Sequence, residues 1–181
     1  VSRDMRLSSP ALAHAFIEGA RTQGADVVDI GLMGTDQLYY AVGRDDHDGG
    51  AQITASHNPG AYNGIKLVGR QAIPLSGDAG ISDIRDMLLS DAVPAPAALR
   101  GGYSQTRVFD DYIEHVLSFI DQSTLRPFSL VLDAGSGIGG LVAPALFDRL
   151  PCRTRRLCFE VDGSFPNHEA NPLIEENRRD L

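Results

Sequence analysis

The sequence predicts an α/β fold, in which a three-layer α/β/α domain with a mixed sheet precedes an incomplete second α/β domain. Helix and strand patterns alternate along the 181 residues. The hydrophobic content of 43% is enough for one good-sized domain and part of another. The pattern breaks most clearly at 122–127, so we expect domains at 1–125 and 126–181. Because the chain begins at Val1, the start of the first domain is also expected to be missing.

The first domain is expected to contain several short helices and strands. Ser8 and Ser9 followed by Pro10 are typical of a helix start, and apolar residues keep helical spacing up to Gly24. Residues 27–31 have the pattern of a buried strand. The other expected elements are a helix at 35–42, strands at 52–55 and 65–68, a helix at 81–89, a Pro- and Ala-rich connection at 91–102 and an amphipathic helix at 108–120.

The second domain is expected to begin with a strand at 130–132. A glycine-rich turn, a helix at 141–150 and a strand at 156–161 follow it. Cys152 and Cys158 form no C-x-x-C pair and are expected to be ordinary thiols of a cytoplasmic protein.

Charge and hydropathy exclude two classes of partner. The formal net charge is −8 and the isoelectric point is near 5.0, which argues against a nucleic-acid-binding protein. No apolar run is long enough to span a membrane, and no signal peptide is visible. An anionic substrate stays open, since a local group of basic side chains can bind phosphate in an acidic protein. The oligomeric state is not readable from the sequence.

The segment at 53–69, ITASHNPGAYNGIKLVG, contains the most informative pattern. It begins and ends as a strand, with a polar loop between. Pro59 restricts the residue before it to extended geometry, and Gly60 permits a sharp change of direction. Asn63-Gly64 favours a tight turn into the next strand. This pattern predicts that Ser56 lies at the loop tip, clear of the core.

The residues around Ser56 suggest phosphate chemistry. Strand alternation places Lys66 on the face opposite its apolar neighbours, where it can return close to Ser56 and His57. A serine nucleophile needs an adjacent base or positive charge, and a phosphoserine needs cationic partners. Ser56, Lys66 and His57 supply a nucleophile, a cation and a proton-transfer group. From this geometry alone, a surface turn without function is equally open.

Further segments extend the pattern into a resemblance. TASHNP at 54–59 and YNGIK at 62–66 resemble the phosphoserine loop of the α-D-phosphohexomutase family, which includes phosphomannomutase and phosphoglucomutase. The match is dense over about a dozen residues, unlike a short glycine fingerprint. Other segments that resemble the family are SRDMRLS at 2–8, GTDQLYYA at 34–41, VLDAG at 131–135 and DGSFPNH at 162–168.

The resemblance implies a mutase in which Ser56 bears the phosphate. It implies transfer to a hexose phosphate of the mannose or glucose type through a bound hexose 1,6-bisphosphate, with phosphoglucosamine mutase as an alternative. Lys66 and His57 would take part in catalysis, and Arg3, Arg6 and Asn58 would contact phosphate or substrate.

Magnesium would bind an oxygen of the phosphoserine at Ser56, with aspartates as further ligands. The family's Asp-Gly-Asp-x-Asp-Arg metal loop does not occur in the sequence and is expected beyond Leu181. The sugar-recognition loop and the terminal phosphate-binding domain are expected to be missing as well. On this interpretation the isolated fragment is inactive.

Two other interpretations stay open. The turn DAGSGIGG at 133–140 has the G-x-G-x-x-G spacing of a nucleotide- or S-adenosylmethionine-binding loop, and Glu160 or Asp162 lies at the distance of a ribose-binding acid. The alternative for these glycines is tight packing between strand and helix. In the second interpretation, the chain is a non-catalytic module that retains only the fold.

Several polar residues have plainer interpretations. Arg3 and Arg6 fit a salt bridge at the helix start as well as phosphate binding. The acidic run at 45–49 is expected to be a solvated turn, because it lacks the ligand spacing of a calcium loop. His168 has no second ligand beside it in the sequence, so it is expected to shape the linker rather than to bind zinc. Arg153, Arg155 and Arg156 are expected on a solvated strand face.

Overall fold

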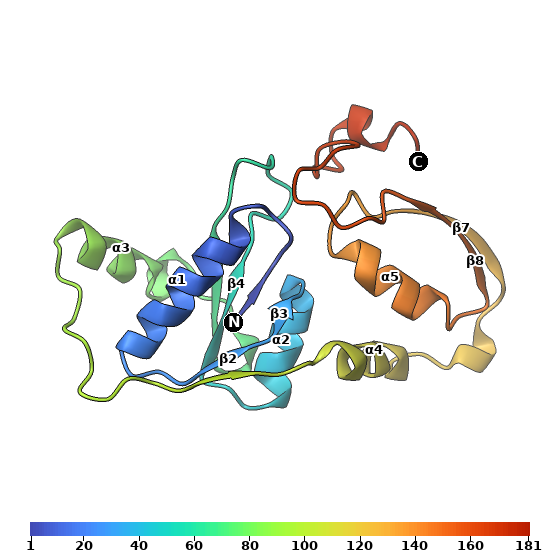
Figure 1. Cartoon of the computed structure of the whole chain (residues 1–181). Helices are drawn as coiled ribbons and strands as arrows, with labels where there is room; N and C mark the ends of the chain where they lie inside the picture. The colour runs from blue at the N-terminus through green and yellow to red at the C-terminus, as the bar shows by residue number, and fades with distance from the viewer.

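The computed structural model describes residues 1–181 and contains a mixed four-stranded sheet (Figure 1). Its strands are β1 (Ser2–Arg3), β3 (Gly31–Leu32), β4 (Gly49–Ile53) and β5 (Ile65–Gly69), in the order β3-β1-β4-β5. β1 runs parallel to β3 and β4, whereas β5 runs antiparallel to β4. The mixed sheet predicted for the first domain is therefore confirmed.

Two helices pack on this sheet. α1 (Ser9–Thr22) buries Ala13 and Ile17, which lie four residues apart and so share one helix face. α2 (Thr35–Arg44) presents Leu38 and Val42 in the same way, and both approach Gly50 of β4 closely. Figure 1 shows the two helices on opposite sides of β4, so the sheet lies between two helical layers.

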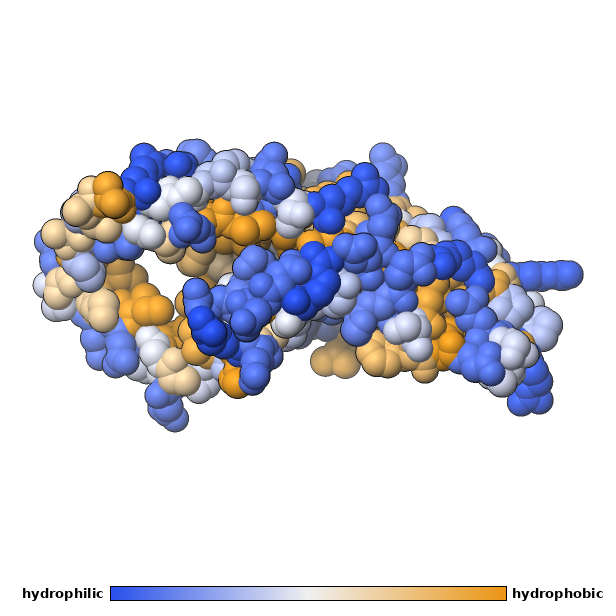
Figure 2. All heavy atoms as spheres, turned by 90° about the horizontal axis from the view of Figure 1, so that it is seen from below, coloured by the Kyte–Doolittle hydropathy of each residue, from blue (hydrophilic) through white to orange (hydrophobic).

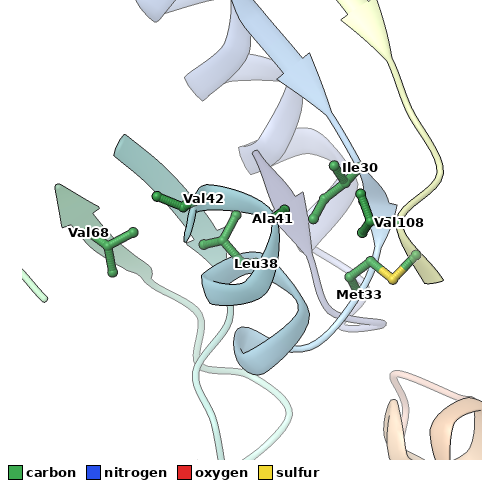
Figure 3. Close-up of a cluster of buried hydrophobic side chains, with 7 residues drawn as sticks. All are labelled: Ile30, Met33, Leu38, Ala41, Val42, Val68 and Val108. Atoms are coloured by element: carbon green, nitrogen blue, oxygen red, sulfur yellow. The ribbon is translucent and has the colours of Figure 1, made fainter. Parts of the chain in front are cut away.

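The main hydrophobic core lies between α2 and the sheet. Leu38 and Val42 of α2 lie toward Val68 of β5, and Ala41 lies on the side of Ile30 (Figure 3). The other members of the cluster are Ile30, Met33 and Val108. Burying an aliphatic side chain of this size stabilises a fold by about 1.5–3 kcal/mol relative to leaving it exposed. The cluster thereby fixes α2, whose first residues border the site described below.

A second, small sheet was only partly predicted. The strand expected at 27–31 is divided, because β2 (Val27–Asp29) pairs with β6 (Tyr103–Gln105) while β3 pairs with β1. Gly31 adopts a positive φ of 76°, and this change of direction separates β2 from β3. β6 lies just beyond the Pro- and Ala-rich connection and was not predicted. α3 (Ile81–Leu89) precedes this connection, as expected.

The second half of the chain forms a parallel β-α-β unit. β7 (Phe128–Asp133) pairs in parallel with β8 (Cys152–Leu157), and α5 (Gly139–Phe147) connects them. The strand expected at 156–161 is thus wrong in its bounds, since it begins at Cys152 and ends at Leu157. Its three arginines are exposed, as predicted.

α4 (Phe109–Ser118) contacts both halves of the molecule. Tyr112, Ile113 and Leu117 form a cluster with Tyr40 of α2 and with apolar residues of α5. The chain also contains short 3-10 turns at Arg70–Ala72, Gly77–Ala79, Gln122–Thr124 and Glu175–Arg178. α4 therefore connects the two halves through apolar contacts.

The helices are short, and many large apolar side chains are exposed. The longest helix, α1, has 14 residues, and no helix is both long and apolar enough to cross a membrane. Figure 2 shows apolar atoms bordering an opening at the α3 end of the molecule. Exposed apolar side chains of α3 include Ile84, Met87, Leu88 and Leu89.

Candidate active site

A cavity of about 490 Å³ lies between the first sheet and the β-α-β unit. One wall consists of Asp4, the start of α2 at Gly34, and the loop that follows β4 with Ser56 and His57. The other wall consists of the glycine-rich turn after β7 and residues between Phe165 and Leu181. The volume lies in the range typical of small-molecule sites.

The loop after β4 is closed by backbone hydrogen bonds. The Thr54 N–H donates to the Gly64 carbonyl at 2.9 Å, which joins the two ends of the loop. Within it, both the backbone N–H and the side-chain Nδ2 of Asn58 donate to the Ala55 carbonyl. The Gly64 N–H donates to Asn63 Oδ1 at 2.8 Å. The tight turn expected at Asn63-Gly64 is wrong, because the chain turns at 56–57 and 60–61 and Gly64 has no positive φ. These bonds give the loop a defined shape.

Ser56 is exposed at the loop tip, as predicted. Its backbone has a φ of 55°, in the left-handed region that a non-glycine residue seldom adopts. The Ser56 N–H donates to Thr54 Oγ1 at 3.0 Å, which holds this conformation. Ser56 Oγ lies 3.2 Å from His57 Nδ1, within hydrogen-bond distance. The hydroxyl therefore faces the cavity beside a group that can exchange a proton with it.

Arg6 lies beneath this loop and is fully buried. Its NH1 donates to the carbonyls of Pro59 and Tyr62, and its NH2 donates to the carbonyls of Ser56 and Asn58, all at 2.8–3.0 Å. Its Nε donates to Asp4 Oδ2 at 3.2 Å. A guanidinium has five N–H donors, and all five are used here. The expected phosphate contact from Arg6 therefore finds no free donor, and its side chain organises the loop instead.

Asp4 completes this buried network. Its carboxylate accepts from the Arg6 backbone N–H, from Ser9 Oγ at the start of α1 and from Thr54 Oγ1. Because charged hydrogen bonds in a buried site are strong, these contacts fix the loop relative to α1. Asp4 and Thr54 lie within the SRDMRLS and TASHNP segments, but sequence reasoning gave neither of them a role.

Of the six expected site residues, Ser56 and His57 line the cavity, whereas Arg3, Arg6, Asn58 and Lys66 do not. Arg3 borders a separate cavity with Arg21 and Asp29, and its NH1 donates to the Asp4 carbonyl at 3.3 Å. Lys66 is exposed on β5, directly opposite Gln52 in the antiparallel register. Opposite residues share a sheet face, and Gln52 lines the cavity, so Lys66 lies on the cavity side of the sheet. Arg178 is the single basic residue, Lys or Arg, that lines the cavity.

In the second half of the chain, the segment after β8 packs closely against the glycine-rich turn. A Cβ on Gly140 would lie 2.2 Å from the Phe159 carbonyl oxygen, so this position needs glycine for close packing of α5. Ser136 is buried and donates its backbone N–H to the Cys158 carbonyl at 2.8 Å. These contacts favour the packing interpretation of the glycine spacing over a cofactor loop.

The segment at 162–168 joins the two walls. A Cβ on Gly163 would lie 2.1 Å from the Met5 carbonyl oxygen, so glycine is required for this close approach. The Phe165 ring lies 5.2 Å from the Arg6 guanidinium carbon, a cation–π arrangement. Arg6 thus holds the Ser56 loop on one side and contacts the second half on the other.

Three ionisable side chains meet at the end of β7. His168 Nε2 lies 3.1 Å from Asp133 Oδ2, and Cys158 lies beside both. The backbone hydrogen bond to Glu169 raises the pKa of His168, while burial raises the pKa of the Cys158 thiol. His168 was expected to shape the linker because no second ligand lies beside it in the sequence, and the fold brings Asp133 and Cys158 next to it. Because the three residues are 10 to 35 positions apart in sequence, no spacing pattern could indicate the cluster.

Magnesium was expected at the phosphoserine, and the residues present fit it only in part. Ser56 supplies a hydroxyl that could carry one phosphate ligand. Asp4 is the carboxylate held nearest to the base of its loop, and four hydrogen bonds already use its oxygens. A magnesium ion requires several oxygen ligands in octahedral geometry. The residues of this chain do not provide such a set around Ser56.

Comparison with known proteins assigns both halves of the chain to one family. Residues 1–92 match the phosphoglucomutase/phosphomannomutase alpha/beta/alpha domain I, and residues 110–181 match the alpha/beta/alpha domain II of the same family. The domain boundary that we place near residue 125 stays a prediction.

Individual relatives agree with this assignment. The chain is 44% identical over 178 residues to "Phosphohexose mutases" of Xanthomonas campestris pv. campestris (strain B100) and 42% identical over 183 residues to a phosphomannomutase of Salmonella typhimurium (strain LT2). Each alignment covers 98% of this chain and 40% of the relative. The chain therefore spans about two fifths of the length of these curated relatives.

A solved structure shows the same arrangement. The crystal structure of a phosphoglucomutase/phosphomannomutase family protein from Burkholderia thailandensis superimposes with a TM-score of 0.86 at 36% identity, covering 99% of this chain and 40% of that one. The sequence matches extend across both walls of the cavity, and the fold agrees over nearly the whole chain. The chain belongs to the phosphoglucomutase/phosphomannomutase family.

Proposed function

We propose that Ser56 carries the transferred phosphoryl group of a hexose phosphate mutase, in a protein with the full length of its relatives. The observation that carries the proposal is the loop geometry. An exposed hydroxyl, 3.2 Å from an imidazole nitrogen, faces a cavity of about 490 Å³ on a loop that Arg6 holds from beneath. Relatives named phosphomannomutase and phosphohexose mutases support the same reaction class.

The first transfer starts from phosphorylated Ser56 and a hexose monophosphate. The bond between phosphorus and Oγ breaks, and a new bond forms between phosphorus and a sugar hydroxyl oxygen, which loses its proton to a base. The product is a hexose 1,6-bisphosphate, and Oγ takes up a proton. After the bisphosphate turns over, its other phosphoryl group returns to Oγ. Both transfers depend on in-line positioning more than on new covalent chemistry.

The neighbouring residues have separate roles in this proposal. His57 exchanges the proton with Ser56 Oγ, because its Nδ1 is the side-chain atom bonded to that oxygen. Lys66 contributes positive charge from the cavity side of β5. Asn58 shapes the loop through its two bonds to the Ala55 carbonyl. Arg178, rather than Arg3 or Arg6, is the guanidinium available to a substrate phosphate within this chain.

The sugar is proposed to be a mannose or glucose phosphate. This choice rests on the phosphomannomutase relatives and on the resemblance of the GTDQLYYA segment. Glucosamine phosphate is the alternative substrate. Turnover of the three sugar 1-phosphates by the full-length protein, compared under the same conditions, separates these choices.

Mass spectrometry of the full-length protein tests the phosphoryl carrier. After incubation with glucose 1,6-bisphosphate, we expect one phosphoryl group on the loop peptide, localised by fragmentation to Ser56. The peptide containing Ser136 provides an internal control, because that serine is 1% exposed. A Ser56→Ala protein should remain unmodified at this peptide. An unmodified Ser56 in folded, magnesium-loaded protein would contradict the proposal, as would phosphate on another residue of the loop.

A further inference from the structure

Asp133, Cys158 and His168 bring an oxygen, a sulfur and a nitrogen donor together at the end of β7. Their ligand atoms all lie within 4.8 Å of one another. Each side chain is partly buried: the Asp133 side chain is 11% exposed and that of His168 is 21% exposed. Such a mixed cluster differs from a group of surface carboxylates, because each donor comes from a different part of the chain and is held inside the fold.

The orientation of His168 favours a cation in this cluster. Its Nδ1 lies 2.9 Å from the Glu169 carbonyl oxygen, which can only accept, so Nδ1 carries a proton and donates it. In the neutral ring, Nε2 then directs its lone pair toward Asp133 Oδ2 at 3.1 Å. Two acceptors at this separation require a proton or a metal ion between them. Metal-binding histidines usually donate their second ring N–H to a carbonyl in this manner.

We propose that Asp133, Cys158 and His168 form a zinc-binding site at the end of β7. Zinc accepts sulfur, nitrogen and oxygen ligands in tetrahedral geometry at about 2.0–2.3 Å. Nitrogen and oxygen ligands at these distances from one tetrahedral ion lie roughly 3.3–3.5 Å apart. The observed separation of 3.1 Å between Nε2 and Oδ2 is slightly shorter, so a bound ion requires only a small outward shift of the two side chains. A thiolate ligand favours zinc over magnesium and calcium, which prefer oxygen.

The surroundings permit a metal to enter and be retained. Asp133 and His168 both line the cavity, so an ion held between them is reachable from that side. Three protein ligands leave a fourth position for water, as in zinc sites that remain open. Asp180 lies close enough to act electrostatically on both Cys158 and His168, and its negative charge favours a cation here. The site opens into the cavity that Ser56 faces, but none of its three ligands belongs to the Ser56 loop.

Cobalt substitution tests the proposal in the full-length protein. Co²⁺ reports its ligands by absorption, and a cobalt–thiolate bond gives a charge-transfer band that an oxygen-only site does not produce. Any magnesium site near the phosphoserine is therefore distinguished from this one. We expect one equivalent of Co²⁺ to give the thiolate band in metal-free protein, and one equivalent of Zn²⁺ to remove it by displacement.

The two cysteines supply a matched pair of variants. Cys158→Ser should abolish the thiolate band and weaken Zn²⁺ binding by about 100-fold or more, since even outer-shell partners contribute 10–100-fold. Cys152→Ser, at the start of β8 and outside the cluster, should bind like the parent. Circular dichroism of both variants shows whether each is folded.

If Cys158→Ser does not fold, the thermal unfolding of the parent protein with and without zinc still tests the proposal. Zinc that binds the native protein should raise the unfolding temperature of the parent, and the rise should increase with free zinc concentration. The proposal is overturned if the parent shows neither the thiolate band nor this rise. It is also overturned if Cys152→Ser, rather than Cys158→Ser, removes the band.

Discussion

The two loops that face each other across the cavity contain serines with the same backbone conformation and opposite surroundings. Ser56 and Ser136 both have a φ of 55°. Ser56 is exposed, whereas Ser136 is 1% exposed and its Oγ accepts from Asn167 Nδ2 at 3.3 Å. A left-handed serine after a strand is therefore not a sign of reactivity by itself.

The difference lies in what supports each loop. The Ser56 loop directs its carbonyls inward to the Arg6 guanidinium, so its side chains are free to point into the cavity. The Ser136 turn directs its own peptide groups to Cys158 and Asp162 of the following segment, and its side chain is enclosed. A buried cation beneath a loop can thus leave the loop surface available for chemistry.

The largest difference between the two loops is expected when the hydroxyl of each serine is removed. Ser56→Ala should lower kcat of the full-length mutase by about 10³-fold or more, since loss of a covalent nucleophile removes most of the catalysis in other enzymes. Ser136→Ala should leave kcat within a few-fold of the parent and cost about 1 kcal/mol of stability through the lost hydrogen bond. Coupled-assay kinetics and urea unfolding of both variants provide the measurements. Equal kcat losses in the two variants would remove the distinction between the loops.

Replacing the buried cation should have the next largest effect. Arg6→Leu leaves the Asp4 carboxylate and four carbonyls without their partner, and breaking a buried ion pair costs about 3–5 kcal/mol. The free energy of unfolding in urea measures this loss. Arg70→Ala provides the control, because the pair of Arg70 with Asp48 is exposed to solvent and should contribute little to stability. A small change in Arg6→Leu would mean that the loop holds its shape without the guanidinium.

The smallest effect is expected from an exposed pair that connects α4 to the end of α5. A hydrogen bond from Arg149 lowers the pKa of Glu114 below its ordinary value of 4.5. A carboxyl with a lowered pKa stabilises the folded state above pH 4.5, and this contribution disappears as the pH falls through the folded pKa.

Unfolding temperatures of the parent and of Glu114→Gln check this expectation. They should differ slightly at neutral pH and low salt, and the difference should vanish in strong acid. Added salt should also reduce it, because the pair is exposed to solvent. A difference that persisted in acid would indicate a packing role for this side chain instead.

Sequence reasoning located the parts of the site that are contiguous in the chain. The exposed Ser56 loop was predicted because local backbone preferences determine it, whereas the turn expected at Asn63-Gly64 lies at 56–57 and 60–61 instead. The salt bridge of Arg6 at the helix start was one of the two expected roles, and its partner is Asp4. The four bonds of Arg6 to loop carbonyls and the cluster at His168 were not predicted, since their partners lie ten or more residues away. β6 escaped prediction because its pairing with β2 depends on a contact across more than 70 residues rather than on local pattern.

If Ser56 carries the phosphoryl group as we propose, its left-handed backbone places the requirements of function and of stability in conflict at this position. Only glycine adopts a φ of 55° without steric cost, and other residues lose roughly 1 kcal/mol there. Glycine would suit the backbone of this loop best, yet it has no hydroxyl to phosphorylate. Selection for stability alone would therefore drive this position toward an inactive protein, so thermostabilising designs should leave Ser56 unchanged and seek their gains elsewhere.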